Sequence, residues 1–196
     1  MIAIINYKAG NVASVKNALE RLGSACTVTS DPEEILSADG VIFPGQGRAG
    51  AALSELQKAR IDTVIPRITK PFLGICLGMQ LLGRFSEEDN TKCLEVFQGI
   101  SRKFPPTLKT PHLGWNKAEL TKKSPLTAGI TNGSYFYFVH SYYMDATEDQ
   151  TAGTTSYGFD FTSIMQKDNF FAVQFHPEKS GAQGLRLLTN FYELCL

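Results

Sequence analysis

The sequence has few cysteines and histidines, and its cysteines are scattered. Among 196 residues there are four cysteines and three histidines. The cysteines are Cys26, Cys76, Cys93 and Cys195, and no two of them form a C-x-x-C pair. This pattern is unlike a disulfide framework or a structural zinc site and is typical of free thiols in a reducing compartment. We therefore expect no metal and no cofactor, and a cytoplasmic protein.

An excess of charge of one sign is also missing. The chain has 19 Lys and Arg against 19 Asp and Glu, so its formal net charge is zero. No basic stripe is present, which argues against a nucleic acid or a membrane surface as partner. No apolar run approaches the roughly 18 residues of a membrane span. The N-terminal "MIAIINYKAGN" lacks a basic region and a cleavage site, so we expect no signal peptide.

The first half of the chain alternates strand-like and helical patterns. Buried strands are predicted at 2–5, 25–29, 40–43 and 71–75. Helices are predicted after Asn11 (an N-cap, with Gly23 as the stop), from 31, over 52–59 and 61–68, and from Leu77 to about Phe85. Strands that alternate with helices indicate a parallel sheet covered on both faces.

The second half is richer in β-structure. Strand-like stretches are "LEVF", "YFYFVHSYY", "TAGTTSY", "FTSIMQ" and "FFAVQFH", and a helix with apolar Leu185, Leu188, Phe191 and Cys195 closes the chain. Residues 86–92 and 104–112 are predicted loops. No linker divides the sequence. We expect one domain over 1–196: a three-layer α/β/α fold with a mostly parallel central sheet and an extra antiparallel β portion.

A cysteine stands between two glycines where a predicted strand turns into a helix. In "GICLGMQ", Gly74 and Gly78 flank Cys76, the cysteine version of a nucleophile elbow. The glycines remove side chains that would crowd the sharp turn, and a helix N-terminus favours the thiolate. The amide of Leu77 would face an oxyanion formed on an attacked carbonyl. The alternative is a small buried residue in a tight connection.

A base and its orienting group follow another predicted strand. His176 and Glu178 lie in "FHPEKS", where the carboxylate can hold the imidazole with its other nitrogen toward sulfur. His140 and His112 are the competing histidines. His140 follows an aromatic run and is equally consistent with a hydrogen-bonded core histidine, and His112 has no carboxylate nearby in sequence. His176 is the favoured base.

A glycine loop ends a third strand. In "PGQG" (44–47), a peptide N–H at Gly45 or Gln46 would complete an oxyanion hole with Leu77. The alternative is an ordinary glycine turn. A cysteine, a His–Glu pair and a glycine loop at three strand ends together predict an acyl-transfer site.

In this order and spacing, "PGQG", "GICLGMQ" and "FHPEKS" resemble the class I (triad) glutamine amidotransferases, whose domain is flavodoxin-like, and the match covers essentially the whole chain. The N-terminal "INYKAGNVASVKNALERLG", "PHLGWN" and "YFVHSY" are similar to the glutaminase subunits of imidazole glycerol phosphate synthases, of histidine biosynthesis. The tryptophan-bearing string is the most specific of these.

The resemblance implies a role for each matching residue. Cys76 would attack the γ-carboxamide of L-glutamine, His176 would shuttle the proton and Glu178 would orient His176. Ammonia would leave, and water would hydrolyse the thioester to glutamate. The amino-acid end of glutamine would be held by Gln80, Glu88 and the backbone around Ser141 and Tyr142. For Glu88, a solvated acid in a charged loop remains the alternative reading.

The resemblance also implies a partner. A (β/α)8-barrel cyclase subunit, forming a heterodimer, would receive the ammonia and dock on Asn11, Pro111, Trp115, Asn116, Tyr137 and Lys179. Trp115 is equally compatible with a core position. The chain departs from the family at Gln46, followed by Arg48, where a small aliphatic residue is more usual. We expect the free subunit to be nearly inactive until the partner docks.

Other readings remain open at this level. Glutaminase subunits that feed anthranilate, aminodeoxychorismate or pyridoxal phosphate synthesis share the triad, although "PHLGWN" and "GMQ" favour the histidine pathway. A non-catalytic binding module with the same fold would not need all three triad residues. A cysteine hydrolase of another amide, or a thiol stress sensor, would not need Gln80 and Glu88.

Overall fold

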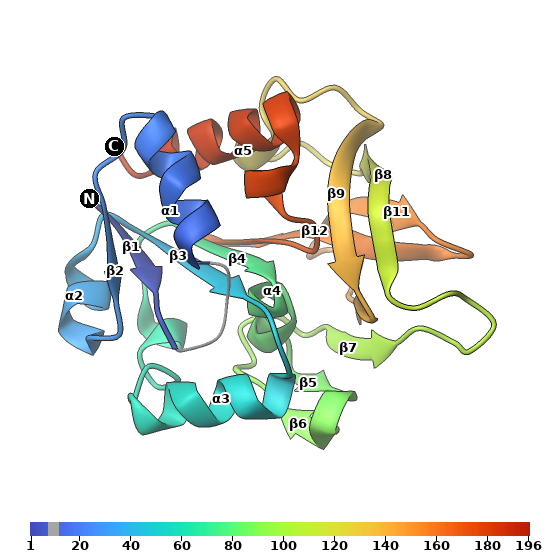
Figure 1. Ribbon diagram of the computed structural model, residues 1–196, viewed down its shortest axis with the longest axis horizontal. Coiled ribbons are helices and arrows are strands. Elements are labelled where there is room, and N and C mark those ends of the chain that lie inside the picture. The colour runs from blue at the N-terminus through green and yellow to red at the C-terminus, as the bar shows by residue number, and fades with distance from the viewer. Residues whose placement is uncertain (8–11) are drawn as a thin grey trace.

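The computed structural model describes residues 1–7 and 12–196. Asn11, the predicted helix cap and partner contact, lies outside the described residues. The two termini of the chain lie close together at one side of the molecule, near the edge strand of the sheet (Figure 1).

The parallel part of the sheet is built from short, buried strands. They are β1 (Ile2–Ile5), β2 (Cys26–Thr29), β3 (Gly40–Gly45), β4 (Phe72–Cys76) and β13 (Phe170–Val173), in the spatial order β2-β1-β3-β4-β13. Every neighbouring pair in this order is parallel. Apart from β2, whose first three residues are half-buried, the strands are buried along their whole length, as expected of a sheet covered on both faces. The predicted parallel sheet is confirmed.

Helices cover both faces of this sheet (Figure 1). One core cluster holds buried residues of α1 (Val12–Arg21) and α5 (Gly181–Leu194), and the other holds those of α2 (Pro32–Ser37), α3 (Ala49–Lys58) and α4 (Leu77–Leu82). Asp31 caps α2 as its sequence predicts, because its side chain accepts a hydrogen bond from the Glu33 amide at 2.9 Å. The helices on the two faces of the sheet confirm the predicted three-layer arrangement.

Antiparallel strands extend the sheet beyond β13. The extension consists of β12 (Asp160–Lys167), β10 (Tyr142–Asp145), β7 (Ile100–Lys103), β5 (Phe85–Ser86) and β6 (Thr91–Lys92). Antiparallel pairing links β13, β12, β10 and β7, whereas β5 runs parallel to β7. A further layer branches from β12 through β11 (Thr151–Ser156) to the hairpin of β8 (His112–Leu120) and β9 (Ser134–His140). This is the expected antiparallel portion.

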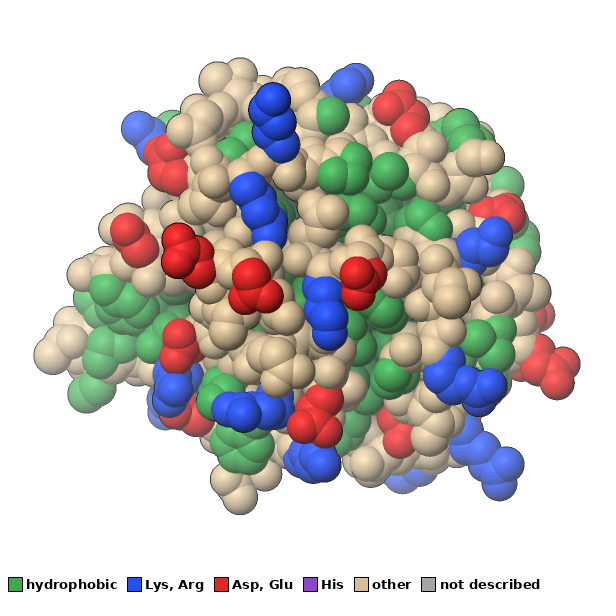
Figure 2. Space-filling model, turned by 180° about the vertical axis from the view of Figure 1, so that it is seen from behind, with side chains coloured by type: hydrophobic (Ala, Val, Ile, Leu, Met, Phe, Trp, Pro, Cys, Tyr) green, Lys and Arg blue, Asp and Glu red, His purple; other side chains and the backbone are tan. Residues whose placement is uncertain are grey.

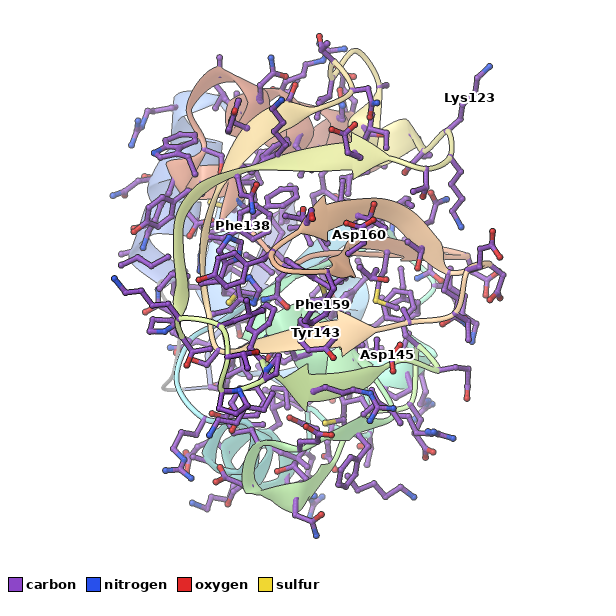
Figure 3. The ribbon with its side chains drawn as sticks, turned by 90° about the vertical axis from the view of Figure 1, so that its right-hand side faces the viewer. Lys123, Phe138, Tyr143, Asp145, Phe159 and Asp160 are labelled. Atoms are coloured by element: carbon purple, nitrogen blue, oxygen red, sulfur yellow. The ribbon has the colours of Figure 1, made fainter. Side chains whose placement is uncertain are left out.

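Aromatic side chains fill the space between the hairpin and the antiparallel strands. Phe138, Tyr143 and Phe159 project into this space, while Lys123 points outward (Figure 3). Phe104 lies at the centre, with its ring centroid 5.0 Å from that of Tyr143. The cluster packs the hairpin against the sheet, and the end of that hairpin forms one wall of the cavity described below.

Four predicted elements differ in the structure. The loop expected over 86–92 contains a 3-10 turn, Glu88–Asn90, and the strand β6. The helix expected over 61–68 is only a 3-10 turn, Ile65–Arg67, because Pro66 removes a backbone donor and disfavours α-helix at the residue before it. The strand expected at "LEVF" is absent from residues 94–97, where Glu95 has a left-handed φ of 54°. The helix from Leu77 ends at Leu82, short of Phe85, with Gly83 as its cap.

Short 3-10 turns and mixed surface charge complete the molecule. Besides Ile65–Arg67, these turns are η2 (Glu88–Asn90), η3 (Pro125–Thr127) and η4 (Pro177–Lys179). Acidic and basic side chains are interspersed over the face seen in Figure 2. Within residues 1–7 and 12–196, no helix has the length and apolar character needed to cross a membrane.

Candidate active site

Cys76 occupies a strained turn at the end of β4. Its φ of 54° and ψ of −109° are rare for a residue with a side chain, and α4 begins at the next residue. Gly78 is required there, because a Cβ atom would lie 2.0 Å from the carbonyl oxygen of Phe43. At Gly74 a Cβ atom would lie 2.7 Å from Leu82 Cδ1. The strand–turn–helix geometry is therefore that of a nucleophile elbow.

His176 and Glu178 form a buried pair, and the His176 ring interacts with Cys76. Nδ1 of His176 lies 2.9 Å from Oε1 of Glu178, and the two side chains are 2% and 0% exposed. The pair follows β13 on the turn η4, and the amide of His176 donates to the Tyr137 carbonyl at 2.9 Å. Because the carboxylate accepts a hydrogen bond from the Nδ1–H group, Nε2 is left to face other groups. Nε2 is buried, and residues 1–7 and 12–196 supply no hydrogen-bond partner for it.

The surroundings of His176 favour its charged form. Burial alone lowers the pKa of this imidazole, but its interactions with the Cys76 sulfur and the Glu178 carboxylate outweigh that effect. Together they raise the pKa of His176 to about 10. The raised pKa follows from two acidic partners on one ring, which is the arrangement of a thiolate–imidazolium pair.

One cavity joins the groups that the sequence selected. It has a volume of about 450 Å³, and its lining includes Gln46, Gly47, Cys76, Leu77, Gln80, Glu88, Pro111, Tyr137, Ser141, Tyr142, His176 and Lys179. A second cavity of about 510 Å³, bordered by Tyr143, Asp145 and Asp160, has neither cysteine nor histidine in its lining (Figure 3). The first is therefore the candidate active site.

The glycine loop approaches Cys76 closely. A Cβ atom on Gly45 would lie 2.6 Å from the Gly78 nitrogen and 2.7 Å from Leu77 Cβ, so this position also requires glycine. The next residue, Gln46, is exposed at the cavity. Arg48 forms an ion pair with Asp89, which ties the glycine loop to the turn η2.

Glu88 lies on that turn and belongs to the cavity wall. Its Oε2 accepts a hydrogen bond from the Ala49 amide at 2.8 Å, which fixes the carboxylate at the start of α3. Burial raises the pKa of Glu88 above its usual value, because desolvation disfavours the carboxylate. A cation that enters the cavity stabilises a half-buried carboxylate with a raised pKa more than it stabilises a solvated one. This property distinguishes Glu88 from a solvated loop acid.

Gln80 is held by two acceptors. Its Nε2 donates to the Tyr142 carbonyl at 3.0 Å and to Oε1 of Gln174 at 3.1 Å. Gln174 itself was not selected by the sequence analysis. Its Nε2 lies 3.6 Å from the sulfur of Cys76, and its side chain is fully buried. The one available signal was its place in "FFAVQFH", where a polar residue interrupts an apolar run.

His140 and His112 are not at the sulfur but form a buried pair of their own. Nδ1 of His112 lies 3.0 Å from Nε2 of His140, and Nδ1 of His140 lies 2.7 Å from the Tyr142 carbonyl. Burial lowers the pKa of His112 to about 4 and that of His140 to about 3, so both are neutral near pH 7. His140 borders the cavity as a hydrogen-bonded core histidine.

Of the residues assigned to a partner surface, Asn11 lies outside the described residues, and three of the others are cavity-lining residues. Pro111, Tyr137 and Lys179 line the cavity, and the Lys179 ammonium lies 5.8 Å from the centre of the Tyr137 ring. Trp115 is 55% exposed, so it is not a core residue. The Asn116 amide nitrogen is used internally, by His112 at 3.2 Å and by the Ser156 carbonyl at 2.9 Å.

Comparisons with known proteins agree with this geometry. The family "Glutamine amidotransferase class-I" matches residues 3–195. The "Imidazole glycerol phosphate synthase subunit HisH" of Desulfovibrio desulfuricans is 46% identical, over 100% of this chain and 95% of that protein. The proteins of that name from Bacteroides fragilis and Methanocaldococcus jannaschii are each 48% identical, over 98% and 99% of this chain and 99% and 100% of their own.

Solved structures share the fold at low sequence identity. PurLQS from Thermotoga maritima aligns with a TM-score of 0.79 at 16% identity, covering 98% of this chain and 97% of that one. A glutamine amidotransferase of the same organism aligns with a TM-score of 0.66 at 17% identity, covering 98% and 81%. Fold and sequence relatives agree, and the chain belongs to the class-I glutamine amidotransferase family and, within it, to the HisH subunits of imidazole glycerol phosphate synthase.

Proposed function

We propose that this chain hydrolyses L-glutamine to glutamate and ammonia, and passes the ammonia to a cyclase subunit in histidine biosynthesis. The observation that carries the proposal is the placement of Cys76 and His176 on one cavity, with Glu178 paired to His176 behind it, in a chain that belongs to the HisH subunits. The cyclase would use the ammonia to make imidazole glycerol phosphate and an aminoimidazole carboxamide ribotide.

The nucleophilic step uses the elbow and the buried pair. The Cys76 thiolate attacks the γ-carboxamide carbon, and the carbonyl π electrons move to oxygen. His176, held by Glu178 at 2.9 Å, gives its Nε2 proton to the leaving amide nitrogen, so that ammonia departs and a γ-glutamyl thioester forms. Water, deprotonated by the same nitrogen, then attacks the thioester, which releases glutamate and regenerates the Cys76 thiolate and the protonated His176.

The oxyanion is placed between the elbow and the glycine loop. The Leu77 amide is the first of α4 and has no partner within the helix, so it is available to an oxygen beside Cys76. A second donor from Gly45 or Gln46 completes the hole. The close packing of Gly45 against Leu77 and Gly78 supports this assignment.

We assign the amino-acid end of glutamine to the part of the cavity that Glu88 lines. Glu88 pairs with the α-ammonium, which relieves the cost of its burial. Gln80 and the backbone at Ser141 and Tyr142 complete the binding site. The Tyr142 carbonyl already accepts from Gln80 and His140, so its role is to orient them, and Gln80 is held ready for substrate.

The surface around the cavity mouth is proposed to dock the (β/α)8-barrel cyclase as a heterodimer. Trp115 and Tyr137 stand opposite each other on β8 and β9, with ring centroids 6.1 Å apart. Pro111 and Lys179 adjoin them, and Asn11 and Asn116 are assigned to the same surface. A partner seated here would cover the cavity and receive ammonia without loss to water. We place the complex in the cytoplasm.

Glutamine hydrolysis measured with and without the cyclase tests the proposal. We expect the complex to produce glutamate, with Cys76→Ala inactive and the free subunit nearly inactive. Cys93→Ala, at a buried cysteine away from the cavity, is the matched control and should retain activity. A complex without glutaminase activity, or an active Cys76→Ala variant, would exclude the proposed reaction.

The docking surface has its own control. Trp115→Ala should weaken cyclase binding by at least about tenfold, as expected of a buried interfacial tryptophan. Tyr135 lies on the same hairpin, is similarly exposed at 53% and is absent from the cavity wall, so Tyr135→Ala should change binding much less. If titration calorimetry shows equal losses of cyclase affinity for the two variants, the cyclase binds at another surface.

A further inference from the structure

Gln174 lies behind the cavity wall, in contact with Gln80 and with the sulfur of Cys76. It directly follows β13, it is 0% exposed, and its backbone amide donates to the Ser163 carbonyl at 2.9 Å. Its side-chain oxygen meets Nε2 of Gln80 at 3.1 Å, and its nitrogen meets Sγ of Cys76 at 3.6 Å. The side chain is not part of the cavity lining, so it does not contact substrate there.

The orientation of the Gln174 amide is set by its neighbours. The Tyr142 carbonyl can only accept, so the end of Gln80 that faces it must be the NH2 group. The same NH2 group faces Gln174, which must therefore present its oxygen to Gln80. As a result, the NH2 group of Gln174 points at sulfur. No other orientation of the Gln174 amide keeps both hydrogen bonds of Gln80.

We propose that Gln174 is a hydrogen-bond donor that holds the Cys76 sulfur as a thiolate aimed into the cavity, in addition to His176. The inference deepens the proposed function and rests on it for the nucleophilic role of Cys76. Gln80 carries the link from the substrate cavity to Gln174, so one amide chain joins the glutamine site to the nucleophile.

Competing contacts at the sulfur explain why a donor is needed. The Val139 carbonyl lies 3.9 Å from Sγ, and an acceptor at that place favours the protonated thiol. Cys76 is only 7% exposed, so water contributes little to holding a negative charge. A charged sulfur gains more than a neutral one from an N–H donor, and Gln174 therefore shifts the balance toward thiolate.

The rate of iodoacetamide alkylation of Cys76, followed by peptide mass spectrometry from about pH 5 to about pH 9, tests the proposal without glutamine. Gln174→Met removes the donor at similar side-chain volume. We expect the midpoint of the pH profile to rise by about one unit, the size of one hydrogen bond to a charged group, and alkylation at pH values below the midpoint to slow by about tenfold. The fully folded subunit is used throughout.

Two further variants separate the donor from general loosening. Gln80→Met frees the oxygen of Gln174, so the amide loses its fixed orientation and the midpoint should rise by a smaller amount. Gln150→Met is the matched control, since Gln150 is also buried and bonded, to the Gln98 amide at 2.9 Å, but is remote from the cavity. It should leave the alkylation profile of Cys76 unchanged.

Two outcomes would overturn the inference. One is a Gln174→Met protein that melts near the wild-type temperature yet keeps the wild-type alkylation profile. The other is an equal shift in Gln150→Met, which would indicate a structural effect. If Gln174→Met does not fold, the Gln80→Met profile decides, and an unchanged midpoint there counts against the inference.

The same experiment distinguishes this inference from the proposed function. Alkylation reports on the sulfur alone, whereas glutamate release in the cyclase complex reports on the reaction. A shifted alkylation profile with no glutamine turnover in the wild-type complex would retain the role of Gln174 and reject the glutaminase. Turnover with an unshifted profile would do the reverse.

Discussion

His176 and Glu178 are two residues apart in sequence and share a 2.9 Å contact, with both side chains closed to solvent. The turn η4 makes this possible, because Pro177 begins it and brings the two side chains to the same side. Ser180 steadies the turn by donating to the His176 carbonyl at 2.6 Å. The imidazole is consequently fixed in one orientation.

Glu178→Gln should therefore reduce turnover strongly. The amide can present its NH2 group to Nδ1, which selects the wrong tautomer, and a neutral group no longer stabilises the imidazolium. We expect kcat in the cyclase complex to fall by about 100-fold or more, with KM for glutamine changed by less than about threefold. Steady-state glutamate production measures both constants. A kcat within about twofold of wild type would remove Glu178 from the mechanism.

Glu88→Gln should separate substrate binding from stability. Glu88 is kept partly buried with a raised pKa, so its carboxylate destabilises the folded protein at neutral pH and is useful only when a cation binds. We expect KM for glutamine to rise by at least about tenfold, while the melting temperature at pH 7 stays equal or increases. The Ala49 amide keeps an oxygen acceptor in this variant. Unchanged KM would return Glu88 to the role of a surface acid.

The raised pKa of Glu88 also fixes the sign of a pH effect. Its protonated form is favoured in the folded state, so this group's contribution to stability is present at low pH and is lost as pH rises through the folded pKa. Glutamine binding runs in the opposite direction, since it needs the carboxylate. KM should therefore increase as pH falls toward that pKa, and this dependence should vanish in Glu88→Gln.

The neutral pair His112–His140 predicts sensitivity to mild acid. Both pKa values are lowered, to about 4 and about 3, so between these values and the usual value near 6.5 the unfolded chain binds more protons. The stability that the pair contributes is present above about pH 6.5 and is lost as pH falls. His176 stays protonated in the folded state over this range, and its loss of a proton in the unfolded chain near pH 6.5 acts in the opposite direction, equally in the wild type and in a variant of His112.

His112→Asn tests this assignment. Asparagine keeps an amide nitrogen near the place of Nδ1, so it can still donate to His140, but it does not titrate. Urea denaturation between about pH 5 and about pH 7 should show a pH slope reduced by roughly one proton. Identical slopes in the two proteins would mean that His112 is charged in the folded state.

Gly78→Ala tests the steric basis of the elbow. Its new methyl group would lie 2.0 Å from the backbone oxygen of Phe43, which cannot move without displacing β3. We expect a loss of stability of at least about 3 kcal/mol and loss of Cys76 labelling. Gly50→Ala is the control, because its nearest contact is the side chain of Asp89 at 3.0 Å on an exposed turn. A small cost at Gly78 would contradict the packing described.

The sequence was sufficient for the parallel sheet, and it selected the histidine that contacts Glu178 in the structure. Alternating buried strands and capped helices are local patterns, and a residue directly after a parallel strand has a defined place at the sheet edge. The helix expected over 61–68 was wrong because apolar spacing was weighed without Pro66, which stands in the middle of it.

Gln174 and the His112–His140 pair could not be predicted in the same way. Gln174 is separated from Gln80 by 94 positions in the sequence and from Cys76 by 98, and the two histidines are separated by 28. Only the folded sheet brings these residues together. The burial of a polar side chain also cannot be predicted from the surrounding residues, because an amide inside an apolar run is compatible with either face of a strand. Long-range hydrogen bonds of this kind could therefore not be predicted from the sequence.

The central claim is that Cys76 attacks the carboxamide of glutamine, and covalent labelling measures this most directly. A diazo-ketone analogue of glutamine, added to the cyclase complex, should modify Cys76 with loss of glutaminase activity, and excess glutamine should protect it. Cys26, Cys93 and Cys195 should stay unmodified in the same peptide map. Labelling spread over the four cysteines, or inactivation with Cys76 unmodified, would contradict the account.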